Sequence, residues 1–337
     1  MYYTYVYLKL NLNEIKFNEY NSEEKRNFPA STFKTINMKK TTAFFALLAL
    51  LFAACNSSST NNSSTDSTNN DTSNSNINAA ADPAQDWHLG VALWTFHTVS
   101  FPQSLDLVDS AGLKYIEPNT FHKAGAELKD SMILQLSPAG IDTLKTMIAR
   151  HGFTCQSIYI VGDSTIASWK HQFDIAKQMG VQFVTTEPPL NMWDSIDSLA
   201  GAYGIKVAIH EHWKGFSHYW NPDTTLMAIK GHPNFGVCAD LGHWPKSGIN
   251  PLDAVKKLSG HIIAVHLKDI AAYNNTALVD VPVGTGVVDF PAIFQELKKQ
   301  GFKGPIYIER DAQEQPNNLQ SVKQEIQYYN EQIKKLQ

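Results

Sequence analysis

Eight short apolar segments constrain the fold of this chain more than any other feature. They are rich in valine, isoleucine, tyrosine and phenylalanine, and each is nearly continuous rather than alternating with polar residues. Such runs are typical of parallel strands that are buried on both faces. The segments are HLGVALW (88–94), KYIEP (114–118), FTCQSIYI (153–160), QFVTTEP (182–188), KVAIHEH (206–212), FGVCADLG (235–242), IIAVHLKD (262–269) and PIYIERD (305–311).

Stretches with helical spacing separate these segments, for example Phe173, Ala176 and Met179, and a glycine follows six of the helical stretches. Eight strands alternating with helices predict an α/β fold of the (β/α)8 TIM barrel type. The roughly 250 residues from Ala84 to Gln337 are enough for one such domain. A doubly wound open sheet would normally carry a glycine-rich phosphate loop after its first strand, and LWTFHTVSFP has no glycine.

The charge balance argues against a polyanionic partner. The chain has 28 Lys and Arg against 32 Asp and Glu, a net charge of -4 with neutral histidines. Because proteins that bind nucleic acids need a basic surface, we expect no nucleic acid partner.

The segment before the barrel predicts export. Residues 38–55 read MKKTTAFFALLALLFAAC, which resembles a bacterial lipoprotein signal peptide that ends at a lipidated Cys55. Residues 1–37 are interpreted as a non-native upstream extension, and the Ser, Thr and Asn of residues 56–83 as a disordered linker. The barrel, residues 84–337, is thus expected on the periplasmic side or the cell surface of a Gram-negative bacterium, in contact with the membrane only through its anchor.

Six polar residues of metal-ligand type stand where strand segments end: Glu187, His210, His212, Asp240, His266 and Glu309. In a (β/α)8 barrel the carboxyl ends of all strands meet at one face, so ligands distant in sequence can converge on one cation. The pattern predicts a divalent-metal site built from residues of this set.

The segment His210, Glu211 and His212 leaves two alternatives open. Side chains alternate along a strand, so His210 and His212 share one face while Glu211 takes the other. The sequence does not decide which face enters the barrel mouth. We expect His210 and Glu211 to contact substrate, together with three further polar or aromatic residues near strand ends: Trp94, Glu117 and Trp244.

With these residues in place, the domain resembles the sugar phosphate isomerase/epimerase superfamily, the xylose isomerase-like TIM barrels. The resemblance rests on VAIHEHW, CADLGHW, HLKDI, VPVGTGVVDF and YIERD, in that order. It implies a Glu, Asp, His, Glu set around manganese, and Asp240, His266 and Glu309 match the last three members. The first member has no clean match, so Glu187 is taken as the fourth ligand, with Glu211 and His212 as substitutes.

The resemblance also implies a reaction. A divalent cation, expected to be Mn²⁺ with Mg²⁺, Co²⁺ or Zn²⁺ as alternatives, would hold a sugar or keto-sugar while a proton leaves the carbon beside its carbonyl and an enediolate forms. The residues expected to move protons or stabilise charge are Glu187, Glu309, His212, His243 and Lys268. An exported barrel does not meet phosphorylated sugars, so the substrate is predicted to be unphosphorylated.

Three other functions compete with this isomerase or epimerase. A lyase that eliminates the glycosidic group of a 3-keto-glycoside would use the same site. A non-catalytic sugar-binding lipoprotein would keep only the barrel. A relative of endonuclease IV would need a basic groove, which the acidic composition disfavours. Cys155 and Cys238 are expected to be small buried core residues, and no feature of the sequence bears on the oligomeric state.

Overall fold

The computed structural model describes residues 86–336. The predicted upstream extension, signal peptide, lipidated Cys55 and linker lie outside the described residues and stay predictions. Within the described part of the chain, no helix is both long enough and apolar enough to cross a membrane.

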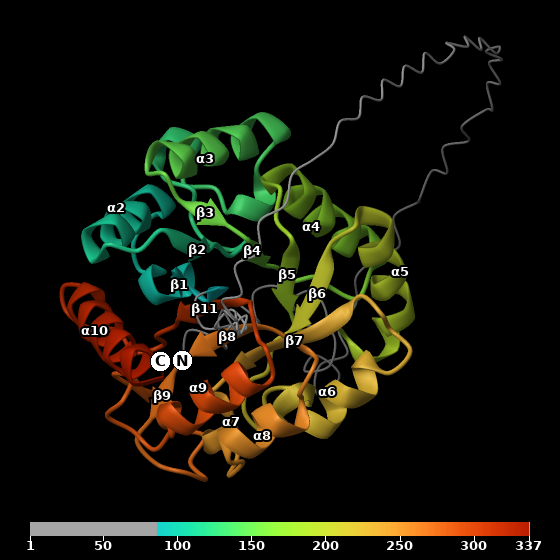
Figure 1. The fold of residues 1–337 in the computed structure, drawn as a ribbon. Coiled ribbons are helices and arrows are strands. Elements are labelled where there is room, and N and C mark those ends of the chain that lie inside the picture. The colour runs from blue at the N-terminus through green and yellow to red at the C-terminus, as the bar shows by residue number, and fades with distance from the viewer. Residues whose placement is uncertain (1–85, 337) are drawn as a thin grey trace, which may run out of the picture. The chain divides into compact units, whose positions relative to one another are not determined.

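Parallel strands form a nearly closed barrel with helices around it, as the sequence predicted (Figure 1). The order in the sheet is β3-β2-β1-β11-β8-β7-β6-β5-β4, and every pairing is parallel. The strands are β1 (His88–Ala92), β2 (Tyr115–Glu117), β3 (Thr154–Cys155), β4 (Ser157–Tyr159), β5 (Phe183–Thr186), β6 (Lys206–Ile209), β7 (Phe235–Asp240), β8 (Ile262–Leu267) and β11 (Pro305–Ile308).

The two ends of this sheet are neighbours in sequence. β3 and β4 are the halves of one predicted strand, separated only by Gln156. β3 pairs with β2, and β4 pairs with β5. This segment therefore supplies both end strands of the sheet, and the barrel is nearly closed there. The nine observed strands therefore correspond to the eight predicted ones.

Helices follow the strands in the alternation that the sequence predicted. Several neighbouring helices contact one another, among them α3 with α4, α4 with α5 and α8 with α9, and the last helix packs against both α2 and α9 (Figure 1). The α-helices are α2 (Phe101–Ala111), α3 (Pro138–Arg150), α4 (Ile166–Met179), α5 (Trp193–Tyr203), α6 (Pro222–Ile229), α7 (His243–Lys246), α8 (Pro251–Lys257), α9 (Phe290–Lys299) and α10 (Leu319–Leu336).

Short 3-10 helices and one hairpin complete the fold. The 3-10 helices are η2 (Leu93–Phe96), η3 (Ala126–Leu128), η4 (Ile133–Gln135), η5 (Leu190–Met192) and η6 (His218–Trp220). The antiparallel pair β9 (Asp269–Ile270) and β10 (Asp280–Val281) lies outside the barrel sheet.

The glycines that the sequence predicted after the helices have the left-handed backbone conformation expected there. At the end of α4, Gly180 has φ 77° and its N–H donates to the carbonyls of Ala176 and Lys177. A residue with a side chain would be strained in this left-handed conformation. The other five predicted glycines have the same sign of φ: Gly112, Gly152, Gly204, Gly260 and Gly301.

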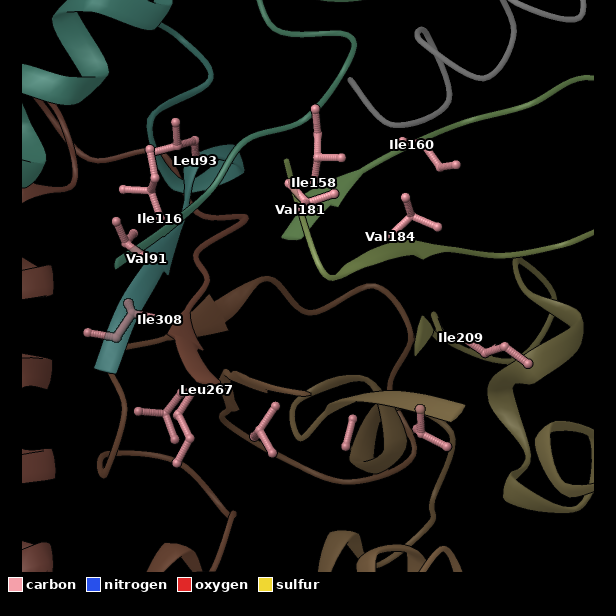
Figure 2. Close-up of a cluster of buried hydrophobic side chains, with 14 of the residues drawn as sticks. Val91, Leu93, Ile116, Ile158, Ile160, Val181, Val184, Ile209, Leu267 and Ile308 are labelled. Atoms are coloured by element: carbon pink, nitrogen blue, oxygen red, sulfur yellow. The ribbon is translucent and has the colours of Figure 1, made fainter. Parts of the chain in front are cut away.

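Two apolar layers lie on opposite faces of the barrel wall. The larger layer joins strands to helices, and Figure 2 shows part of it, with Ile116, Ile158 and Val184 among its labelled side chains. The smaller layer fills the barrel interior with residues that alternate with the first set: Ala92, Phe183, Ala208, Cys238, Ala264 and Tyr307. Cys238 is buried and Cys155 is half-buried, and both are free thiols.

We predict that the larger layer carries much of the stability. Phe173 of α4 is fully buried, and Phe173→Ala should destabilise the barrel by about 3 to 5 kcal/mol through lost burial and a cavity. Ile166 of the same helix is 47% exposed, so Ile166→Ala should cost much less. Urea denaturation followed by circular dichroism measures both, and equal losses would contradict this description of the core.

Candidate functional site

The alternation of side chains along the strands determines which residues reach the candidate site. Ala208, Cys238, Ala264 and Tyr307 belong to the interior layer, and the residues two positions further on must point the same way. Those residues gather at the carboxyl end of the barrel, and all are almost completely buried: His210, Asp240, His266 and Glu309.

These four residues form a compact group in which each offers one ligand atom within 4.8 Å of the others. His210 Nε2 lies 3.5 Å from Asp240 Oδ2 and 3.9 Å from Glu309 Oε2. His266 Nδ1 lies 2.8 Å from Glu309 Oε2. Neither ring nitrogen of His210 has a hydrogen-bond partner among the described residues, although the ring is buried.

A second group of ligand types adjoins the first and shares His210. It consists of Glu187, His210 and His212. His212 Nδ1 is hydrogen bonded to Glu187 Oε1, and Ser217 Oγ donates to Glu187 Oε2 at 2.6 Å. Glu187 Oε1 also lies 3.7 Å from His210 Nδ1.

The fourth member of the main group differs from the sequence prediction. Glu187 was expected beside Asp240, His266 and Glu309, but His210 stands there instead. Glu187 is held in the second group because His212 and Ser217 bind its two carboxylate oxygens. The alternation of strand β6 then places both histidines on the inner face, which settles the alternative that the sequence left open.

Glu211 occupies the other face of this strand. Its Oε1 accepts a hydrogen bond from the backbone N–H of Asp240 at 2.8 Å, and its side chain is buried. Burial raises the pKa of the Glu211 carboxyl well above its usual value. Glu211 therefore lies behind Asp240 and belongs to neither ligand group, in contrast to its predicted contact with substrate.

Glu117 and Trp244 also differ from their predicted places in the barrel mouth. Glu117 Oε2 lies 2.7 Å from His266 Nε2, so this carboxylate sits beneath the group and fixes the imidazole. Trp244, in α7, is 1% exposed and packs in the larger apolar layer. The sequence located both residues near strand ends but gave no information on the direction of their side chains.

Lys268 brings a positive charge to the main group. Its Nζ lies 3.1 Å from each of Asp240 Oδ2, Glu309 Oε2 and Asp311 Oδ2. Burial alone would lower the pKa of this ammonium group, but the carboxylates hold it well above its ordinary value. Gly242 allows this approach, because a Cβ there would meet Lys268 Cγ at 2.6 Å.

The imidazoles are not equivalent in charge. Burial would lower the pKa of His210, but the carboxylates of Asp240 and Glu187 raise it to about 9. Burial lowers the pKa of His243 well below its ordinary value, although its Nε2 lies 3.5 Å from Asp240 Oδ2. Burial would raise the pKa of Glu187, but His212 and His210 outweigh it and lower that pKa to about 2.

Sequence reasoning missed Asp311, the residue two positions beyond Glu309. It binds Lys268 and accepts a hydrogen bond from Trp94 Nε1 at 3.0 Å, so the predicted Trp94 reaches the site through Asp311. The same two-residue period that identified Glu309 would have identified Asp311. Ser217 was missed as well, and no strand pattern marks it because it follows β6 in a loop.

A buried ion-pair network holds Asp311 in place. Asp280 Oδ1 accepts from the backbone N–H groups of Asp311 and Ala312 at 2.7 and 2.6 Å, while its Oδ2 binds Arg310 Nε. Arg310 also donates to Glu325 Oε1 at 3.1 Å. The end of β11 is thus fixed by the hairpin strand β10 and by α10.

We predict that Asp280→Ala destabilises the protein by about 3 to 5 kcal/mol, because it leaves the buried Arg310 guanidinium without one of its partners. Asp109→Ala, which removes an exposed ion pair with Lys114, is the matched control and should have a much smaller effect on stability. Thermal denaturation distinguishes the two, and a small loss for Asp280→Ala would contradict the proposed support of Asp311.

Comparison with known proteins identifies the family to which the barrel is similar. The sequence model of a family described as "Xylose isomerase-like TIM barrel" matches residues 105–332. L-ribulose-5-phosphate 3-epimerase UlaE of Salmonella paratyphi A is 35% identical over 95 residues, which cover 28% of this chain and 29% of that protein. The chain thus matches less than a third of the length of this relative.

Solved structures share the fold over most of the barrel. An uncharacterized protein from Parabacteroides distasonis ATCC 8503 is 32% identical, with a TM-score of 0.59, and the match covers 73% of this chain and 99% of that one. The IOLI protein, crystallised with a bound zinc atom, is 18% identical with a TM-score of 0.63, and the match covers 74% of this chain and 99% of that one.

Proposed function

The chain belongs to the xylose isomerase-like TIM barrel family, and from this premise we propose that it is a divalent-metal-dependent isomerase or epimerase of an unphosphorylated sugar or keto-sugar. The observation that carries the proposal is the buried group of two imidazoles and two carboxylates at the carboxyl end of the barrel. Enzymes on this fold place their active sites at that end.

The spacing of the donor atoms fits one cation. With bonds of about 2.0 to 2.2 Å and tetrahedral angles, two ligand atoms of one ion stand about 3.4 Å apart. Three measured separations are 2.8, 3.5 and 3.9 Å. His210 also supports the fit, because a buried imidazole without a hydrogen-bond partner among the described residues lacks the contact that buried polar groups normally make.

The surroundings of His266 support the same assignment. Its Nδ1 faces the group, while its Nε2 faces Glu117 at 2.7 Å. A histidine ligand commonly donates its second ring N–H to a carboxylate, which fixes the ring and its tautomer. We propose His210, Asp240, His266 and Glu309 as the ligands, and Mn²⁺ as the ion, with Zn²⁺ and Mg²⁺ as alternatives.

A divalent cation would supply Lewis-acid polarisation of the carbonyl of a hydroxyketone. The chain itself must then move the proton on the neighbouring carbon. Glu187 is the carboxylate placed for this step, because it lies beside the main group without belonging to it and is oriented by His212 and Ser217. Lys268, anchored by Asp311, would offset negative charge on the substrate oxygen.

The arginines support an unphosphorylated substrate. The described residues contain two, Arg150 and Arg310. Arg150 is exposed at the end of α3, and Arg310 is buried against Asp280 and Glu325. Neither is available as the bidentate clamp that phosphate recognition commonly uses. The predicted lipid anchor at Cys55 also supports an unphosphorylated substrate, because an exported barrel would not meet phosphorylated sugars.

We predict that His210→Ala lowers the affinity for Mn²⁺ and Zn²⁺ by at least about 100-fold, because it removes a ligand rather than a supporting contact. Calorimetric titration of the metal-stripped protein measures this. His261→Ala, exposed just before β8, is the control and should bind normally. If Glu187→Ala loses the ion while His210→Ala keeps it, the ligand set expected from sequence is the right one.

We predict that Glu187→Gln lowers proton exchange on the substrate by about 10²- to 10⁴-fold while the metal content stays constant. Exchange is followed by NMR in D2O with dihydroxyacetone, D-fructose and D-tagatose. Glu127→Gln, exposed on η3, is the control. Full activity of Glu187→Gln would exclude this carboxylate as the base, and release of an aglycone from a 3-keto-glycoside would identify the lyase.

A further inference from the structure

Asn119 carries a buried side-chain amide that makes no hydrogen bond within the part of the chain that the structure describes. Its side chain is 2% exposed, and neither Oδ1 nor Nδ2 has a hydrogen-bond partner among residues 86–336. Asn318 is equally buried, yet its Nδ2 donates to the carbonyls of Thr95 and Ala312, both at 2.8 Å. An unpaired buried amide costs stability, so a group outside the fold is the natural partner for Asn119.

The strand pattern directs Asn119 into the barrel mouth. Ile116 and Ile158 belong to the layer between strands and helices, as Figure 2 shows, so the residues after them face the interior. Glu117 does so, since it binds His266. Asn119 lies two residues further on and is bridged in parallel to Tyr159, whose ring stands 5.4 Å from the ring of His210.

Two aromatic residues adjoin Asn119 along the backbone: Phe121 lies two residues further on, and Tyr159 lies across the parallel bridge. Phe121 and Tyr159 are half-buried, and their ring centroids are 5.9 Å apart. Trp94 continues the series, with its ring 5.8 Å from that of Phe121. Aromatic faces beside one polar group with both a donor and an acceptor form the kind of surface that binds a sugar ring.

We propose that Asn119, with Phe121 and Tyr159, forms a subsite for a vicinal diol on the part of the sugar that lies away from the ligand group. Nδ2 donates to one hydroxyl and Oδ1 accepts from its neighbour, while a ring face supports the carbons. The subsite determines specificity and takes no part in proton transfer. It rests on the proposed function only for the identity of the substrate as a sugar.

The test compares two ketones that share a reacting centre. Dihydroxyacetone carries the hydroxyketone but no diol beyond it, whereas D-tagatose and D-fructose carry both. Asn119→Ala should lower kcat/KM for deuterium exchange on the hexuloses at least 10-fold and change exchange on dihydroxyacetone less than twofold. Equal effects on both classes, or no effect on either, would overturn the subsite.

Thermal stability provides a readout independent of turnover. Asn119→Ala should leave the Tm of the sugar-free protein unchanged within about 2 °C, whereas Asn318→Ala, the matched control, should lower it by several degrees because it breaks two buried hydrogen bonds. A loss for Asn119→Ala as large as that for Asn318→Ala would show a purely structural amide, for instance one bonded to buried water.

The same measurements separate this inference from the proposed function. If the wild-type protein exchanges no proton on any ketone, the proposed isomerase chemistry fails. The subsite is then judged by the rise in Tm that tens of millimolar D-tagatose produces, which should be present in wild type and absent in Asn119→Ala. No difference between the two proteins would overturn it.

Discussion

The alternation of side chains along parallel strands is the constraint on which the candidate site depends. Each strand gives its outward residues to the apolar layer under the helices and its inward residues to the barrel. On β6 and β7 the inward residues at mid-strand are small and apolar, Ala208 and Cys238, and those two positions later are polar, His210 and Asp240. Two residues along these strands therefore separate a packed core from a cluster of ligand-type groups.

Burying so many ionisable groups is costly unless each has a partner of opposite charge or a hydrogen bond. His266 lies between Glu309 and Glu117, and Lys268 lies among three carboxylates. His210 is buried with neither ring nitrogen hydrogen bonded within the described residues, and its nearest carboxylate oxygens stand 3.5 and 3.7 Å away. A cation bound at this position would complete the arrangement, and His210 is for this reason a candidate ligand.

The sequence predicted the barrel because its signals are local. Apolar runs, helical spacing and glycines that end helices are all visible within a few residues, and the structure has strands and helices in that order. It also located Asp240, His266 and Glu309, which follow from strand register. The positions of Glu187, Glu211 and Trp244 depend instead on contacts between segments distant in sequence, such as Ser217 with Glu187 or Asp240 with Glu211. No periodicity within one segment records such a contact.

Glu187 and Glu309 illustrate how one barrel face can give two carboxylates different tasks. Glu309 directly follows β11 and contacts His266 and Lys268, so its carboxylate is part of the buried group. Glu187 follows β5 and is fixed by the segment after β6: Ser217 Oγ donates to it while accepting from the N–H of Tyr219 in η6. The two carboxylates thus differ in their contacts, since Glu309 lies inside the buried ligand group and Glu187 lies beside it. The segment from His212 to Ser217, which supplies both contacts to Glu187, therefore sets the geometry of the proposed base, and its conformation should affect the proton step more than the binding of the ion.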